Sequence, residues 1–104
     1  MSGSSIRATG TVLSSRKYSD AAGNAVHELL ITQGPQSLPI LARRTFGARP
    51  ADHIAACGLE RHYRPGQCVA ATGRSLRYQP RRALLELVGA DHLEAAASPE
   101  PAIA

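Results

Sequence analysis

The chain has 104 residues, enough for one domain, and its 12 Lys and Arg residues against 8 Asp and Glu residues give a formal net charge of +4. It lacks an apolar run near the ~20 residues of a membrane span, a signal-peptide stretch and the cysteines of a disulfide scaffold, so we expect a soluble cytoplasmic protein with no membrane partner. Residues 1–90 hold 12 basic and 5 acidic groups, which favours an anionic polymer or surface as partner.

The first half of the chain predicts three strands. Apolar and polar residues alternate over 6–12, where Gly10 marks a close approach or a bend. Strand character returns over 25–33 and 38–43, and a polar hairpin connection over 14–23 joins the first two strands.

The second half begins with a predicted short helix over residues 50–57. A proline suits its first turn, Asp52 favours its positive N-terminal end, and Gly58 is expected to stop it. Two further strands are predicted over 68–78 and 83–88, joined by a tight, basic loop.

Three strands, one short helix and two strands follow one another as in the OB-fold. The predicted fold class is therefore all-β with one short helix, an OB-fold that forms a five-stranded Greek-key barrel. Residues 5–93 are its domain, residues 1–4 a disordered N-terminus, and residues 94–104, which are rich in Ala and Pro, a flexible tail.

Two segments carry a resemblance to bacterial single-stranded DNA-binding proteins. Residues 18–31 (YSDAAGNAVHELLI) resemble their first hairpin, and residues 65–74 (PGQCVAATGR) resemble their fourth strand, which begins after a glycine turn and ends in a glycine-basic pair. Residues 38–42 (LPILA) are closer to the third strand of primosomal replication protein N, a small dimeric relative. The chain departs from the family in having no tryptophan and no strongly acidic tail, which favours an accessory or primosomal role over general coating of DNA.

All four aromatic residues lie within two positions of a basic residue. Single-stranded nucleic acid favours this combination, because cations follow the phosphates and rings stack on bases at about 1–3 kcal/mol each. The expected nucleic-acid-binding residues are Arg16, Lys17, Tyr18, Arg43, Arg44, Phe46, Arg74, Arg77, Tyr78, Arg81 and Arg82. Residues 77–82 are expected to form one binding finger. The alternative is that the rings pack internally and the arginines are merely solvated, and Tyr63 is expected to be structural.

Neither a metal nor a cofactor is expected. Four potential zinc ligands fall within sixteen residues, but their spacing lacks a close cysteine or histidine pair, and two reduced core cysteines are the preferred interpretation. These residues are His53, Cys57, His62 and Cys68. The sequence also lacks a nucleophile turn and a phosphate-binding glycine loop, and Glu28 and Glu86 are expected as solvent-facing or cross-strand charges, so we predict no enzyme.

The resemblance implies a single-stranded DNA-binding protein that acts in bacterial DNA replication or replication restart. Its expected form is a homodimer, and other replication proteins are further expected partners. One alternative is an OB-fold adaptor of a replication or plasmid-transfer complex, whose basic face docks an acidic protein and binds nucleic acid weakly. A second is an RNA-binding OB protein, which the 4% aromatic content disfavours.

Overall fold

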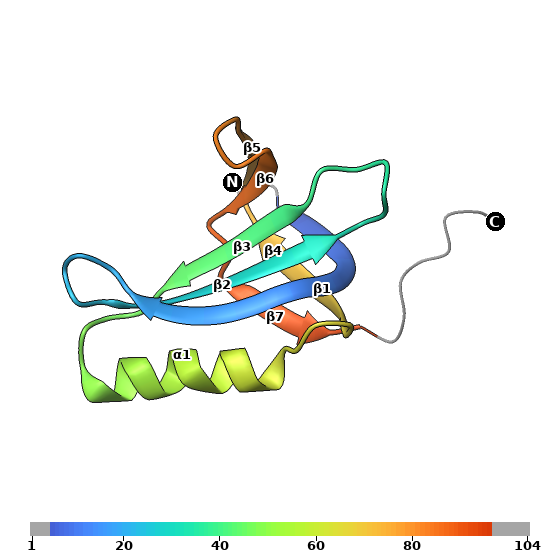
Figure 1. Ribbon diagram of the computed structural model, residues 1–104. Coiled ribbons are helices and arrows are strands. Elements are labelled where there is room, and N and C mark those ends of the chain that lie inside the picture. The colour runs from blue at the N-terminus through green and yellow to red at the C-terminus, as the bar shows by residue number, and fades with distance from the viewer. Residues whose placement is uncertain (1–4, 97–104) are drawn as a thin grey trace.

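The computed structural model describes residues 5–96, which form one helix and one sheet (Figure 1). The strands lie in the order β5-β6-β3-β2-β1-β4-β7. In chain order the elements are β1 (Ile6–Ser19), β2 (Ala25–Thr32), β3 (Ile40–Thr45), α1 (Pro50–His62), β4 (Cys68–Gly73), β5 (Ser75–Gln79), β6 (Leu84–Val88) and β7 (His92–Ala95). The predicted class, mostly β with one helix, is confirmed.

Strand β1 is longer than its apolar alternation indicates. The predicted hairpin connection over 14–23 is wrong in its first part, because residues 14–19 pair with residues 25–30 of β2. Because the side chains on this part of β1 are mostly polar, no apolar alternation indicated a strand there. The turn that remains is short, and the Asp20 carboxylate stabilises it by accepting the backbone N–H groups of Ala22 and Asn24 at 3.0 and 2.9 Å.

Helix α1 packs against β1 and β2 and continues past its predicted end. Gly58 does not stop it, since Leu59 packs on the core and the Glu60 carboxylate accepts the backbone N–H of Lys17 at 3.0 Å. These contacts offset the cost of about 1 kcal/mol that glycine carries inside a helix. Asp52 lies in the first turn as predicted, and its carboxylate accepts the Arg49 backbone N–H at 3.1 Å.

The predicted five-stranded Greek-key barrel is not confirmed, because the sheet is not closed. The sheet has seven strands, and their pairing leaves β5 and β7 at its two edges. The single strand predicted over 68–78 is divided at Arg74 into β4, which pairs with β1 and β7, and β5, which pairs with β6. The predicted tail boundary at residue 93 falls inside β7; the N-terminal residues 1–4 and the tail residues 97–104 lie outside the described residues.

Strands β3 and β6 are parallel and pair over only three residues each. Ile40–Ala42 lie beside Leu85–Leu87, and beyond Ala42 the register joins β3 to β2 alone. After β6 the chain turns away at Gly89, whose positive φ of 70° is one that glycine adopts without strain. The two parallel strands therefore diverge at their carboxyl ends.

The core lies on one face of the curved sheet. Leu29, Ile31 and Leu87 are among its largest fully buried side chains. Tyr63, just after α1, packs at the edge of this cluster and donates its hydroxyl to the backbone oxygen of Leu93 at 3.1 Å, so it is structural as predicted. Within the described part of the chain, the helix is too short and too polar to cross a membrane.

Gly10 lies where β1 closely approaches β2. A Cβ at this position would overlap the backbone oxygen of Thr32 and the side chain of Ile31, so the predicted close approach is confirmed. We expect Gly10→Ala to lower the free energy of unfolding by about 1–3 kcal/mol, as overpacking against a backbone does. Urea unfolding followed by circular dichroism measures this change.

Gly58→Ala is the matched control. An added Cβ there meets no atom within 4 Å, so this variant should gain about 0.4–1 kcal/mol from helix propensity and a less flexible unfolded chain. Equal stability of the two variants would contradict a close approach at Gly10.

Candidate nucleic-acid interface

Two buried carboxylates lie on one face of the sheet and are surrounded there by arginines. Glu28 on β2 is 3% exposed and Glu86 on β6 is 7% exposed. Each is adjacent in sequence to a core leucine, Leu29 or Leu87, so both carboxylates lie on the sheet face opposite the core. The expectation of solvent-facing charges is wrong, and that of cross-strand charges is confirmed by their partners.

Arginines alternate with these carboxylates across five strands. Arg16 and Arg43 lie directly opposite Glu28 on the neighbouring strands, and Arg77 lies opposite Glu86. Nη2 of Arg16 lies 3.2 Å from Oε1 of Glu28, and Nη2 of Arg43 and of Arg77 lie 3.0 and 2.9 Å from the Glu86 oxygens. Arg43 also approaches Glu28 at 4.0 Å. We call Arg16, Glu28, Arg43, Glu86 and Arg77 the charge row.

Three more side chains contact the charge row. The Tyr18 hydroxyl donates to Oε2 of Glu28 at 2.9 Å, and the amide of Gln79 donates to Glu86. Arg82, in the turn between β5 and β6, reaches Oε1 of Glu28 at 3.5 Å. The β5–β6 hairpin is therefore tied to β2 by a side chain as well as to β3 by backbone pairing.

The charge row presents cations to solvent. The side chains of the row's three arginines and of Arg82 are 40–62% exposed, whereas the side chains of Glu28 and Glu86 beneath them are 4% and 9% exposed. Four positive charges against two negative charges leave +2. Because each guanidinium has five N–H donors and an ion pair uses only some of them, the outward donors stay available to a ligand.

The pKa values of both carboxyls lie below the ordinary value. Burial alone would raise the pKa of Glu28, but hydrogen bonds from Tyr18, Arg16 and Arg82 outweigh it. Burial likewise opposes the lowered pKa of Glu86, which hydrogen bonds from Arg77 and Gln79 produce.

The structure brings together five of the predicted binding residues, which are Arg16, Tyr18, Arg43, Arg77 and Arg82. It does not bring Tyr78 to them. Tyr78 alternates with Arg77 along β5, lies opposite Leu85, and is 55% exposed on the other face of the hairpin. The predicted finger over 77–82 is therefore split between two faces.

The other predicted residues also lie apart from the charge row. Arg81 is exposed in the turn before β6, and Lys17 is half-buried and held through its backbone by Glu60. Arg44 stacks its guanidinium 4.7 Å from the centre of the Phe46 ring.

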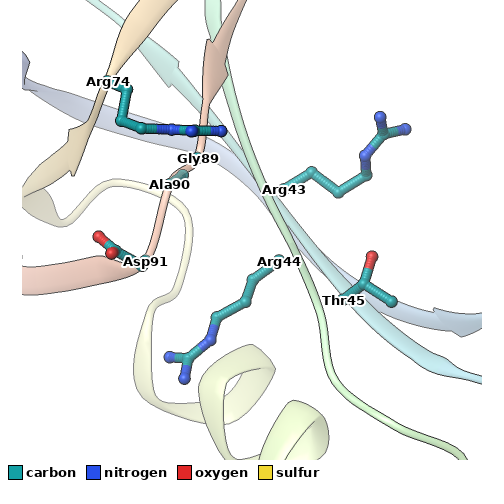
Figure 2. Close-up of a pocket in the computed structure, with 7 residues that line it drawn as sticks. All are labelled: Arg43, Arg44, Thr45, Arg74, Gly89, Ala90 and Asp91. Atoms are coloured by element: carbon teal, nitrogen blue, oxygen red, sulfur yellow. The ribbon is translucent and has the colours of Figure 1, made fainter.

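Arg44 and Arg74 border a crevice of about 540 Å³ between the diverging ends of β3 and β6 (Figure 2). Seven residues line it: Arg43, Arg44, Thr45, Arg74, Gly89, Ala90 and Asp91. Figure 2 shows the Arg43 side chain directed to the opposite side of β3 from Arg44. The crevice thus adjoins the charge row and holds two further predicted residues.

Sequence reasoning missed His27, which is fully buried on the core face of β2, opposite the face that carries Glu28. Its Nε2 lies 2.9 Å from the Ser15 hydroxyl, and its Nδ1 has no partner. Burial lowers the pKa of His27, which favours the neutral ring. Across residues 5–96, no three His, Cys, Asp or Glu side chains gather as a metal site requires.

No protein-family model matches this chain, and no curated protein matches its sequence.

The charge row predicts a loss of stability in acid. The pKa values of the Glu28 and Glu86 carboxyls lie below the ordinary value of 4.5 in the folded protein. As the pH falls, the unfolded chain therefore protonates these two carboxyls before the folded protein does. The stabilisation of the fold by the two carboxylates is complete above about pH 4.5 and is lost as the pH falls below it. Thermal melts between pH 7 and pH 3 should show this decline in the wild type. Glu28→Gln with Glu86→Gln should cost about 1–3 kcal/mol at pH 7 and flatten the decline.

Glu94→Gln is the control, because Glu94 is an exposed carboxylate on β7 paired with Arg7. This variant should keep most of the wild-type acid sensitivity. A melting temperature that stays constant in the wild type from pH 7 to pH 3 would contradict the proposed stabilisation by the row.

Proposed function

We propose that this protein binds single-stranded DNA through the charge row, without enzymatic activity, and that it acts in DNA replication or replication restart. The observation that carries the proposal is the layering of four partly exposed arginines over two buried carboxylates across β1, β2, β3, β6 and β5. Such a surface is a positive strip at right angles to the strands, and a phosphate backbone needs a continuous positive strip.

One aromatic group accompanies this strip. Tyr18 is half-buried beside the row, with its hydroxyl on Glu28 and the Arg16 guanidinium 5.3 Å from its ring centre. An anchored ring bordered by cations is suited to stack on an unpaired base. Tyr18 is therefore the proposed stacking residue, in place of Tyr78.

The connectivity supports an OB-fold as the finer fold proposal. β1 pairs with both β2 and β4, α1 lies between β3 and β4, and β6 returns parallel to β3. The backbone N–H of Arg74, between β4 and β5, donates to the oxygen of Val88 at 2.7 Å, so the bent β4–β5 segment joins β1 to β6. In an OB-fold this face, between the first hairpin and the last loop, binds oligonucleotides.

The resemblance of residues 18–31 and 65–74 to single-stranded DNA-binding proteins supports a role in replication or restart. The adaptor alternative also has one observation in its favour. Leu76 and Tyr78 are 41% and 55% exposed on β5, an edge strand, and such a surface suits a protein partner.

Fluorescence anisotropy with a poly-dT oligonucleotide tests the function. The salt slope is the slope of the logarithm of the binding constant against the logarithm of the salt concentration. Arg16→Gln with Arg77→Gln removes the two ends of the charge row and should lower the magnitude of this slope by about 1.4, which corresponds to two phosphates at about 0.7 each. Circular dichroism checks that the variant is folded.

Arg7→Gln with Arg49→Gln is the matched control, since it removes two charges from outside the row and the crevice. Its salt slope should stay near that of the wild type. If the wild type does not bind poly-dT at physiological salt, the function is wrong and the adaptor alternative is preferred.

We further propose that two copies associate as a homodimer through the β5 edge, where Leu76 and Tyr78 are exposed. Light scattering at tens of micromolar should give twice the 11.0 kDa mass of the chain. Leu76→Lys should shift this mass to that of a monomer, because a charged side chain on an edge strand opposes strand pairing. Arg81→Lys, a charge-conserving change in the neighbouring turn, should leave the mass unchanged, and a monomeric wild type would contradict the dimer.

A further inference from the structure

The crevice opens where two neighbouring parallel strands leave the sheet in different directions. β3 continues to α1 and β6 turns at Gly89 toward β7, so their carboxyl ends border an unfilled space. In open α/β sheets, ligands bind in the crevice outside the carboxyl ends of parallel strands whose connections leave in different directions, and this pair of strands has the same local geometry. β3 and β6 are the one parallel pair among the described strands.

Two arginines that border this space are held in place and lack an acidic partner. Arg44 is stacked on the Phe46 ring, and a Cβ on Gly89 would overlap the guanidinium of Arg74, so this guanidinium lies directly against the glycine backbone. Neither arginine forms an ion pair with an acidic residue in the part of the chain that the structure describes. Held cations without a partner lose less conformational freedom when they bind an anion.

The charge of the crevice fits a monoanion. Two free guanidiniums against the Asp91 carboxylate leave one net positive charge, and the hydroxyl-bearing Thr45 also lines the space. Arg43, whose charge Glu86 and Glu28 already engage, borders both the crevice and the charge row. We infer that the crevice binds one phosphodiester group of a nucleic-acid strand that lies along the charge row. This inference deepens the proposed function and rests on it.

Two probes test the inference on the whole protein. Thymidylyl-thymidine contains one phosphodiester and no terminal phosphate, and in an NMR titration it should shift the amide resonances of Thr45, Gly89 and Ala90. Arg44→Gln with Arg74→Gln should abolish these shifts and weaken poly-dT binding about tenfold, the size expected for a lost charge-assisted hydrogen bond. The magnitude of the salt slope should fall by about 0.7, one phosphate.

Two further variants make the test specific. Arg7→Gln with Arg49→Gln removes the same number of charges and should leave the thymidylyl-thymidine shifts in place. Asp91→Asn removes the one acidic side chain of the crevice and should tighten binding of the dinucleotide. Weaker binding by Asp91→Asn would overturn the inference.

The remaining outcomes separate the inference from the function. Wild-type binding of poly-dT with no effect of the Arg44 and Arg74 changes would overturn the crevice site and leave the charge-row function intact. No poly-dT binding by the wild type would overturn the function itself. Tighter binding of a 5′-phosphorylated oligonucleotide than of its hydroxyl counterpart, lost in the double variant, would assign the crevice to a terminal phosphate and overturn the phosphodiester.

Discussion

A buried carboxylate needs cations beside it, and two such carboxylates constrain how five strands are arranged. Glu28 and Glu86 are nearly inaccessible to water, so each would strongly destabilise the fold if its charge were unpaired. Their partners come from β1, β3, β5 and the turn before β6. These arginines contact Glu28 and Glu86 because β1 is long, because the chain bends at Arg74 and because β5 and β6 form a hairpin.

The same requirement is met by four of the eleven arginines, and by no lysine. A guanidinium can donate inward to a carboxylate and still direct other N–H groups outward, whereas a lysine ammonium is a compact point charge. Arg43 illustrates this, since it contacts both Glu86 and Glu28 and remains 40% exposed. Structural ion pairs and a surface for an anionic ligand are therefore compatible in one set of side chains.

The sequence predicted the elements better than their pairing. Alternation over residues 6–12 and the apolar runs of β2 and β6 identified strands, because burial on one face leaves a period of two. The same reasoning failed over 14–19, where polar side chains carry no such period, and at Gly58, where packing of Leu59 overrides a weak local preference.

The charge row was beyond sequence reasoning for a different reason. The sequence predicted its arginines as basic neighbours of aromatic residues along the chain, yet the contact of Arg43 with Glu86 depends on the register of β3 beside β6, whose residues are about 45 positions apart. One position along β5 separates Arg77, which joins the row, from Tyr78, which lies on the other face. Proximity in sequence grouped these two residues, and the pleat of the strand separates them.

The three-residue contact between β3 and β6 also determines when the row can form during folding. The pairs of β1 with β2 and of β2 with β3 close short turns, so we expect Glu28 to meet Arg16 and Arg43 early. Joining β6 to β3 closes a far longer loop for few backbone bonds, and the entropy of that closure has to be met first by burial of Leu87 and its neighbours. We therefore expect Glu86 to pair with Arg43 only after the core has assembled, when their ion pair favours the native register of β6 beside β3.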